Sequence, residues 1–376
     1  MPQMNPEPTP AYDRLRSPRS GHRPAQPQHR RWSVPIGRVL GIQIRVHFSF
    51  LLIVALFWAA STAPDGPGLA SGMVWLVVIF ACITAHELSH SVVARSRGIG
   101  VRSIVLLPIG GVSELESLTD EPDDEFAVSI VGPLTSLAIA AAAAGGAVLA
   151  GQSLFPVDLF DGALLPRIAW FNLLIGGFNL LPAFPLDGGR VLRSLLERRY
   201  SLERATRTAA RAGRLFAGGM ILIGFLFNFW LVIIGLFVWF GATGEEAATV
   251  VHVRLAGRTV ADLMIDAPHV VEADEPAEHL AVLARATAQR EFPVVDSGAY
   301  VGMASVYDYE NAPAGSTVGD IAVDLPTLDP SASVEQDAVP MLAQRNAPSL
   351  AVTEGGRVVG LLRADDLNRV IRGRAA

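Results

Sequence analysis

Long apolar stretches run through the first two thirds of the sequence and predict membrane-spanning helices. A helix needs about 20 apolar residues to cross a bilayer, and six stretches approach this length, at about 46–63, 72–94, 126–150 and 165–182, with two more within 205–243. Asn228 lies near the middle of the last region and indicates a turn between two helices, although one long tilted helix there would leave five spans. We expect a polytopic α-helical membrane domain of about six spans.

A different pattern separates the second predicted span from the third. Residues Val101–Leu107 alternate and are rich in β-branched side chains, and Pro108 and Gly110–Gly111 then interrupt them. Such a stretch with a break predicts a short pair of strands. We place this small β element at the cytoplasmic face of the membrane domain.

The last third of the sequence contains an internal repeat. The segment TVADLM at Thr259 recurs as TVGDIA at Thr317, 58 residues later, and the same offset relates two glycines and two further aspartates. A constant offset without gaps indicates duplication. Each copy predicts a helix, a strand pair and a second helix, so we expect a soluble α/β pair over 249–376, with repeats at about 257–313 and 314–376.

The composition agrees with a membrane protein. Hydrophobic residues make up 51% of the chain and charged residues 18%, and the mean hydropathy is +0.37, which is more apolar than a typical soluble protein. The net charge of -6 gives no basis for nucleic-acid binding. Residues 1–33 are rich in proline and arginine without apolar periodicity, which predicts a disordered cytoplasmic tail ahead of a membrane domain at 34–248.

The arginines indicate how the spans are oriented. They cluster before the first span and after the second and the fourth, whereas the opposite connections contain only Arg167. Positive charge in short loops favours the cytoplasmic side. This asymmetry fits an even number of spans, so we expect a multi-pass protein of the cell membrane with both termini in the cytoplasm.

Three ionisable residues lie inside the second apolar stretch. His86 and His90 are four residues apart, so on a helix they share one face, with Glu87 beside them. The pattern H-E-x-x-H is the hydrolytic zinc signature, with two histidine ligands and a glutamate that acts as a base. Because ionisable groups in a membrane span are costly and by default mark function, we expect one zinc ion per subunit.

A third ligand is expected at the end of the fourth apolar stretch. Pro182 and Pro185 must break the helix there, and Asp187 follows them directly. Irregular backbone at membrane depth is tolerated where it is buried in protein or lines a polar cavity. Asp187 is therefore the candidate ligand; the alternative is that it caps the following helix.

These motifs together resemble a known family. The segment H-E-L-S-H, with N-L-L-P-A-F-P-L-D-G-G-R from Asn179 to Arg190, resembles the site-2 protease family of intramembrane zinc metalloproteases. The repeat resembles a tandem pair of cystathionine-β-synthase-type (CBS) domains. The resemblance covers about 34–376 and points to the bacterial and archaeal branch that carries such a pair.

The resemblance implies roles for individual residues. It assigns zinc binding to His86, His90 and Asp187 and makes Glu87 the catalytic base. It also suggests that Asn179 assists at the active site, with a helix-packing amide as the alternative.

The resemblance further implies a substrate class. The substrate is a single-span membrane protein, for example an anti-sigma factor, whose transmembrane helix must unwind because its carbonyls are hydrogen-bonded internally. The unwound segment would add as a strand to an exposed sheet edge; the alternative is a plain hairpin at the membrane surface. The candidate edge residues are Ile104, Val105, Leu106, Gly110 and Gly111.

A nucleotide is the implied ligand of the CBS pair. In G-M-A-S-V-Y-D, the hydroxyl of Ser305 would face a phosphate and Asp308 a ribose. The second copy, G-L-L-R-A-D-D, keeps Asp366 but has Arg363 at the hydroxyl position. We expect an adenine nucleotide here that modulates the protease; the alternative is that both repeats are structural and form a homodimer.

Two other functions are compatible with parts of the sequence. A transporter or channel regulated by a CBS pair would need inverted repeats or a polar pore, and it would leave H-E-x-x-H without a role. An inactive metal-binding sensor is disfavoured because Glu87 is intact.

Overall fold

The computed structural model describes the chain from Trp32 to Gly373 with short gaps. The gaps are 64–65, 67, 108–109, 116–120, 160–161 and 288, and for 110–115 the backbone alone is described. The chain divides into two units, one that ends at Thr249 and one that begins at Val250. The predicted tail at 1–33 lies almost entirely outside the described residues.

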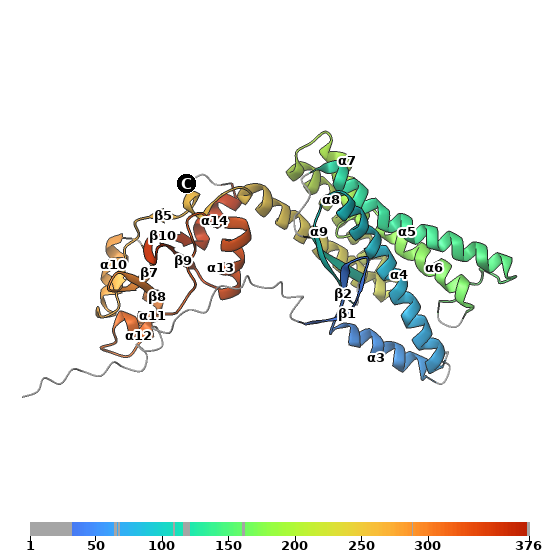
Figure 1. The fold of residues 1–376 in the computed structure, drawn as a ribbon, viewed down its shortest axis with the longest axis horizontal. Helices are drawn as coiled ribbons and strands as arrows, with labels where there is room; N and C mark the ends of the chain where they lie inside the picture. Colours follow the sequence, from blue (N-terminus) through green and yellow to red (C-terminus); the bar gives the residue numbers. More distant parts are fainter. Residues whose placement is uncertain are drawn as a thin grey trace, which may run out of the picture. The chain divides into compact units, whose positions relative to one another are not determined.

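The first unit is mainly helical (Figure 1). Its helices are α3 (Phe50–Ser61), α4 (Leu69–Ser96), α5 (Pro122–Leu149), α6 (Leu164–Asn179), α7 (Asp187–Glu197), α8 (Leu202–Phe227) and α9 (Phe229–Leu255), the last of which continues past Thr249. Helix α5 packs against α4, α6 and α7. It therefore lies at the centre of this unit.

Four of the described helices, α4, α5, α8 and α9, are long and apolar enough to cross a membrane. Helix α3 has 12 residues and so extends only about 18 Å, against a hydrocarbon core of about 30 Å. Helix α3 is shorter than predicted because residues 42–47 of the chain form a strand. Helix α6 has 16 residues and is also shorter than a typical span. The prediction of six spans is therefore not confirmed.

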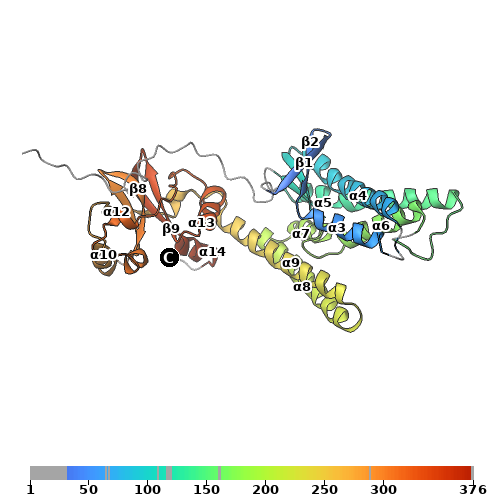
Figure 2. The same ribbon diagram turned by 90° about the horizontal axis from the view of Figure 1, so that it is seen from below.

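Helices α8 and α9 form a hairpin, as Asn228 predicted. Asn228 has an extended backbone, and its side-chain oxygen accepts a hydrogen bond from the backbone N–H of Trp230. The two helices then lie side by side (Figure 2), where Gly224 is close to Val232 and Gly235 to Ile221. Small residues permit this close approach of two apolar helices. The alternative of one long tilted helix is wrong.

The β element of this unit has four strands rather than two. They are β1 (Ser33–Val39), β2 (Ile42–His47), β3 (Val101–Leu107) and β4 (Gly110–Leu115), hydrogen-bonded in that order. Strands β2 and β3 are parallel, and the other two pairs are antiparallel. The sheet packs on α4 through an apolar cluster that joins Ile42, Ile44, Ile104 and Leu106 to Phe80, Ile83 and Leu88.

This strand order corrects the predicted substrate edge. Ile104, Val105 and Leu106 lie in β3, which pairs with β2 on one side and β4 on the other. The prediction is wrong for these three residues because the β1–β2 hairpin fills the side that was expected to be open. Gly110 and Gly111 lie in β4, which ends the sheet among the described strands.

The second unit contains two three-stranded sheets and short helices. One sheet has the order β5 (Ile265–Asp266), β10 (Arg357–Arg363), β9 (Ser349–Glu354), and the other has β6 (Val271–Glu272), β7 (Glu291–Asp296), β8 (Ala299–Ser305). The helices are η1 (Val260–Asp262), α10 (His279–Thr287), α11 (Val306–Glu310), α12 (Val318–Ile321), η2 (Val334–Ala338), α13 (Val339–Arg345) and α14 (Ala364–Ile371).

The sequence duplication is reproduced in the strand pairing of this unit. Ile265 of the first repeat pairs with Leu361 of the second, and Val323 of the second pairs with Met303 of the first. Ile265 and Val323 are equivalent positions of the two repeats, 58 residues apart, and so are Met303 and Leu361. Each repeat therefore contributes a short segment to the sheet of the other. Leu255, the last residue of α9, is fully buried in the core of this unit.

Candidate metal centre

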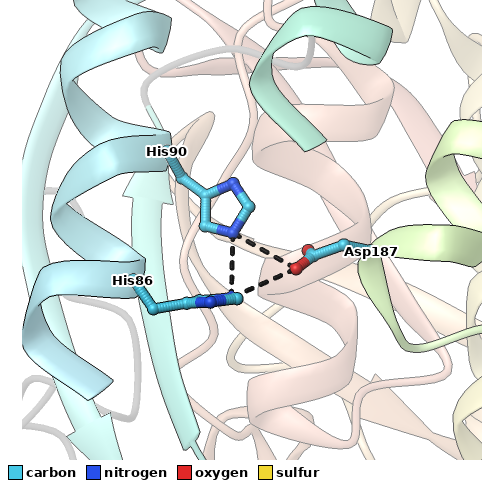
Figure 3. A group of neighbouring side chains, drawn as sticks. All are labelled: His86, His90 and Asp187. Atoms are coloured by element: carbon cyan, nitrogen blue, oxygen red, sulfur yellow. Dashed lines mark hydrogen bonds and ion pairs between the residues drawn. The ribbon is translucent and has the colours of Figure 1, made fainter. Parts of the chain in front are cut away.

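Helix α4 brings His86 and His90 together. The residues are four apart, so both imidazoles project from one face of the helix (Figure 3). Both are buried, and their Nε2 atoms lie 3.2 Å apart. The predicted arrangement of the H-E-x-x-H motif is therefore present.

Asp187 reaches the same point from another part of the chain. Helix α6 ends at Asn179, and the chain turns back before α7 begins at Asp187. The turn is tight: a side chain at Gly188 would overlap the backbone carbonyls of Leu180 and Leu181, which only glycine avoids. The cap position of α7 is Leu186, not Asp187, so the capping alternative is wrong. A carboxylate in the first turn is favoured by the helix dipole.

The three side chains fit a zinc ion. Oδ2 of Asp187 lies 3.2 Å from Nε2 of His86 and 3.2 Å from Nε2 of His90 (Figure 3). With the 3.2 Å between the two nitrogens, these atoms form an equilateral triangle. Zinc binds such ligands at about 2.0–2.1 Å in tetrahedral geometry, which places neighbouring ligand atoms about 3.3 Å apart. Two imidazoles and one carboxylate are also a donor set that zinc prefers.

The other ring nitrogens of both histidines are held by α5. Nδ1 of His90 lies 2.6 Å from the carbonyl oxygen of Val128, and Nδ1 of His86 lies 3.0 Å from Oγ of Ser136. Outer contacts of this kind fix how a metal-binding histidine is oriented. The contact between His86 and Ser136 was not predicted from the sequence. A signal was present in the sequence: Val128, Gly132 and Ser136 are four residues apart along α5, which is also the spacing of the two histidines on α4.

Gly132 of α5 lies directly against the two imidazoles. A Cβ atom at this position would come within 2.8 Å of Nε2 of His86 and closer still to Nε2 of His90. Such separations are inside van der Waals contact, so a side chain here would displace the ligands. The site therefore depends on a residue without a side chain.

Glu87 and Asn179 are the two other residues predicted for this site. Glu87 is half-buried on α4 beside His86, and its negative charge acts on His90. Asn179 is the last residue of α6, and its side-chain amide donates to the carbonyl of Ile175 in the same helix. The position of Glu87 suits a base next to the metal site, whereas this bond leaves the amide of Asn179 directed at its own helix.

A buried ionic network holds α7 in place. Nε of Arg193 donates to both carboxylate oxygens of Glu125 on α5, at 3.0 and 3.1 Å, and Nη1 donates to Glu245 on α9 at 3.0 Å. Glu197 lies 3.8 Å away in the same helix. Because Arg193 is 8% exposed, these charges are largely shielded from water. The network ties the helix that begins with Asp187 to two other helices.

Glu197 has an altered pKa within this network. Burial is the main cause, and the nearby carboxylate of Glu125 adds to it, while Arg193 opposes both. Together they raise the pKa of Glu197 to about 7. Its Oε1 atom is buried and accepts no hydrogen bond from the described residues.

The candidate nucleotide residues of the second unit contact each other. The Ser305 side chain caps α11 and bonds to the Asp308 carboxylate, with 2.6 Å between Oγ and Oδ2. In the second copy, Arg363 binds Asp366 through Nε and Nη2, at 2.7 and 3.1 Å, and Arg369 also contacts Asp366. The two copies therefore hold their equivalent aspartates differently.

Comparisons with known proteins match both units. The model of peptidase family M50 matches 74–164 and 161–220, and that of the CBS domain matches 260–314 and 318–373. The chain is 31% identical over 342 residues to a zinc metalloprotease of Methanocaldococcus jannaschii, covering 90% of this chain and 96% of that one. It is also 34% identical over 378 residues to a Mycobacterium tuberculosis protein whose name is "Putative zinc metalloprotease Rip3". This match covers 90% of this chain and 93% of that one.

Among solved structures, the site-2 protease from Methanocaldococcus jannaschii is similar to part of this chain. The two share 34% identity with a TM-score of 0.44, and the alignment covers 57% of this chain and 95% of that chain.

Proposed function

Because the chain belongs to peptidase family M50, the site-2 protease type of zinc metalloprotease, we propose that it cleaves peptide bonds within transmembrane segments of membrane-protein substrates. The observation that carries this proposal is the triangle of His86, His90 and Asp187, whose ligand atoms are 3.2 Å apart. A metal centre on an apolar helix long enough to span a bilayer supports chemistry at membrane depth.

His86, His90 and Asp187 would hold the ion, one per subunit. Zinc, when bound, supplies a Lewis acid that polarises the scissile carbonyl and makes water more acidic. Glu87 would accept a proton from the attacking water and deliver it to the leaving nitrogen as the carbon–nitrogen bond breaks. This balances the hydrolysis, with one water consumed and two new chain ends formed. Asn179 would assist at this site, although its amide donates to its own helix here.

The substrate would bind as an added strand on β4. A transmembrane helix must unwind before a protease can reach its carbonyls, because these are hydrogen-bonded within the helix. An unwound segment can pair with an open sheet edge through its backbone. Gly110 and Gly111 lie in β4 at the end of the sheet, and the sheet packs on α4, which carries both histidines.

The membrane topology extends beyond the four long helices. We include α3 and α6 among the spans, which gives six, since a bilayer can thin around a short apolar segment. The arginine asymmetry favours cytoplasmic termini in that arrangement, and we propose that the protein lies in the cell membrane.

The CBS pair would modulate cleavage through α9. This helix supplies Glu245 to Arg193 of α7, and its end, Leu255, lies in the core of the CBS unit. A change in the CBS unit that shifts α9 would therefore act on the helix that begins with Asp187. An adenine nucleotide is the proposed ligand, a homodimer formed through the CBS domains is the proposed assembly, and an anti-sigma factor is a proposed substrate.

The proposal is tested with purified protein in liposomes that also contain a single-span substrate. A zinc chelator should abolish cleavage within the transmembrane segment, and added zinc should restore it. A substrate whose helix is strengthened by replacing glycines with leucines serves as the control and should be cut more slowly. Cleavage that continues unchanged under full chelation contradicts the proposal.

A further inference from the structure

Helix α5 turns one face toward the two histidines. Val128, Gly132 and Ser136 are four residues apart, so they lie one above another on this face. Val128 offers its carbonyl to His90, Gly132 leaves room for both rings, and Ser136 offers its hydroxyl to His86. Val128 contributes a backbone group, and Gly132 contributes the space left by its missing side chain. Ser136 is therefore the side-chain contribution of this face.

The two histidines are oriented by different chemistry. A carbonyl can only accept, so Nδ1 of His90 must carry the proton, and Nε2 is left with its lone pair toward the ligand triangle. A hydroxyl can donate or accept, so the tautomer of His86 depends on Ser136. His86 is 4% exposed and Ser136 is 0% exposed, so water cannot readily replace this contact.

We propose that Ser136 is a positioning residue that accepts a hydrogen bond from Nδ1 of His86 and thereby directs Nε2 of His86 to the metal. This inference rests on the proposed zinc site. Loss of such an outer contact typically lowers metal affinity about 10–100-fold. A backbone carbonyl cannot be removed by substitution, so Ser136 is also the position where this orientation can be tested.

A packing role predicts a different result at the same position. Ser136 lies in a close helix contact, where a small residue is needed for size alone. Alanine keeps the small size and removes the hydroxyl, whereas threonine keeps the hydroxyl and adds a methyl group. If only size matters, Ser136→Ala should bind zinc like the wild type and Ser136→Thr should be impaired. If the hydrogen bond matters, the order is reversed.

The test measures zinc affinity of the purified full chain by competition with a chromogenic chelator. Ser136→Ala should bind zinc about 10–100-fold more weakly than the wild type, and Ser136→Thr should recover most of this loss. Ser129→Ala is the matched control, because Ser129 is a second buried serine of α5. The visible spectrum of the cobalt-substituted protein should change in Ser136→Ala and remain unchanged in Ser129→Ala.

The outcomes separate this inference from the proposed function. Equal zinc affinity of Ser136→Ala and wild type overturns the role of Ser136 and leaves the metal site intact. Equal losses in Ser136→Ala and Ser136→Thr also overturn it, because the hydroxyl of threonine would then restore no zinc affinity. A wild-type protein that binds no zinc contradicts the proposed function itself, and with it this inference.

Discussion

Nε2 of His86 lies 3.2 Å from Oδ2 of Asp187, although 101 residues separate the two positions in the chain. One atom belongs to the long helix α4 and the other to the start of α7. A metal centre needs its ligands held within about 0.5 Å of the productive geometry. The helices that set this distance are therefore as important to the site as the ligands.

Gly132 offers a direct test of the space around the histidines. Gly132→Ala places a methyl group in contact with both imidazoles, so we expect zinc content and cleavage to be lost. Gly145→Ala is the control, since Gly145 lies in the same helix and a Cβ there meets nothing within 4 Å. Metal analysis and a cleavage assay check both variants. Full zinc content in Gly132→Ala would show that the rings can move aside.

Arg193 tests the anchoring of α7. Arg193→Ala leaves buried carboxylates without their cation, which typically costs about 3–5 kcal/mol. We expect a lower thermal midpoint and weaker zinc binding, because α7 also carries Asp187. Arg198→Ala is the control: Arg198 pairs with Asp123 at the surface, where such pairs contribute about 0–1 kcal/mol. The same thermal midpoint for both variants would refute the anchoring role.

Glu197 predicts how stability depends on pH. Its pKa rises from 4.5 to about 7 in the folded protein, so the folded state holds more protons than the unfolded state. The free energy of unfolding therefore falls as pH rises through this range. At pH 8, Glu197→Gln should melt about 2–4 °C above the wild type, which is the shift expected for about 1 kcal/mol. At pH 5, the two proteins should melt at the same temperature. Glu203→Gln is the control and should show no such rise, because the ion pair of Glu203 is more exposed.

The two CBS copies should differ in nucleotide binding. Asp308 is bonded to the Ser305 hydroxyl, whereas Asp366 is held by two arginines. We expect Asp308→Ala to weaken binding of an adenine nucleotide at least tenfold and Asp366→Ala to have a smaller effect, because a ribose must compete with those arginines. Calorimetry on the full chain measures both. Equal effects of the two substitutions would contradict this difference.

The grouping of His86, His90 and Asp187 and the repeat could both be predicted from patterns in the sequence. His86 and His90 are linked by helix geometry, and Asp187 follows a proline-broken helix at membrane depth. The 58-residue duplication reappears as reciprocal pairing of Ile265 with Leu361 and Met303 with Val323. For the two histidines and for the repeat, the residue spacing along the chain carries the physical constraint.

Other features depend on contacts between distant segments and were missed. The β1–β2 hairpin lies beside β3 only in the folded protein, so the sequence did not show that Ile104–Leu106 would be interior. The first predicted span was also too long, since β2 ends at His47 and α3 begins at Phe50. Ser136 resembled a small packing residue because its partner lies 50 residues away on another helix.

We propose that His86, His90 and Asp187 hold the zinc ion of a protease in which Glu87 acts as the base. The most direct test measures zinc content and cleavage of a single-span substrate together, for the wild type, Glu87→Gln and Asp187→Ala. We predict that Glu87→Gln keeps its zinc and loses cleavage by at least about 100-fold, the lower range for a general base, and that Asp187→Ala loses both. Bound zinc with equal cleavage by wild type and Glu87→Gln would contradict the account.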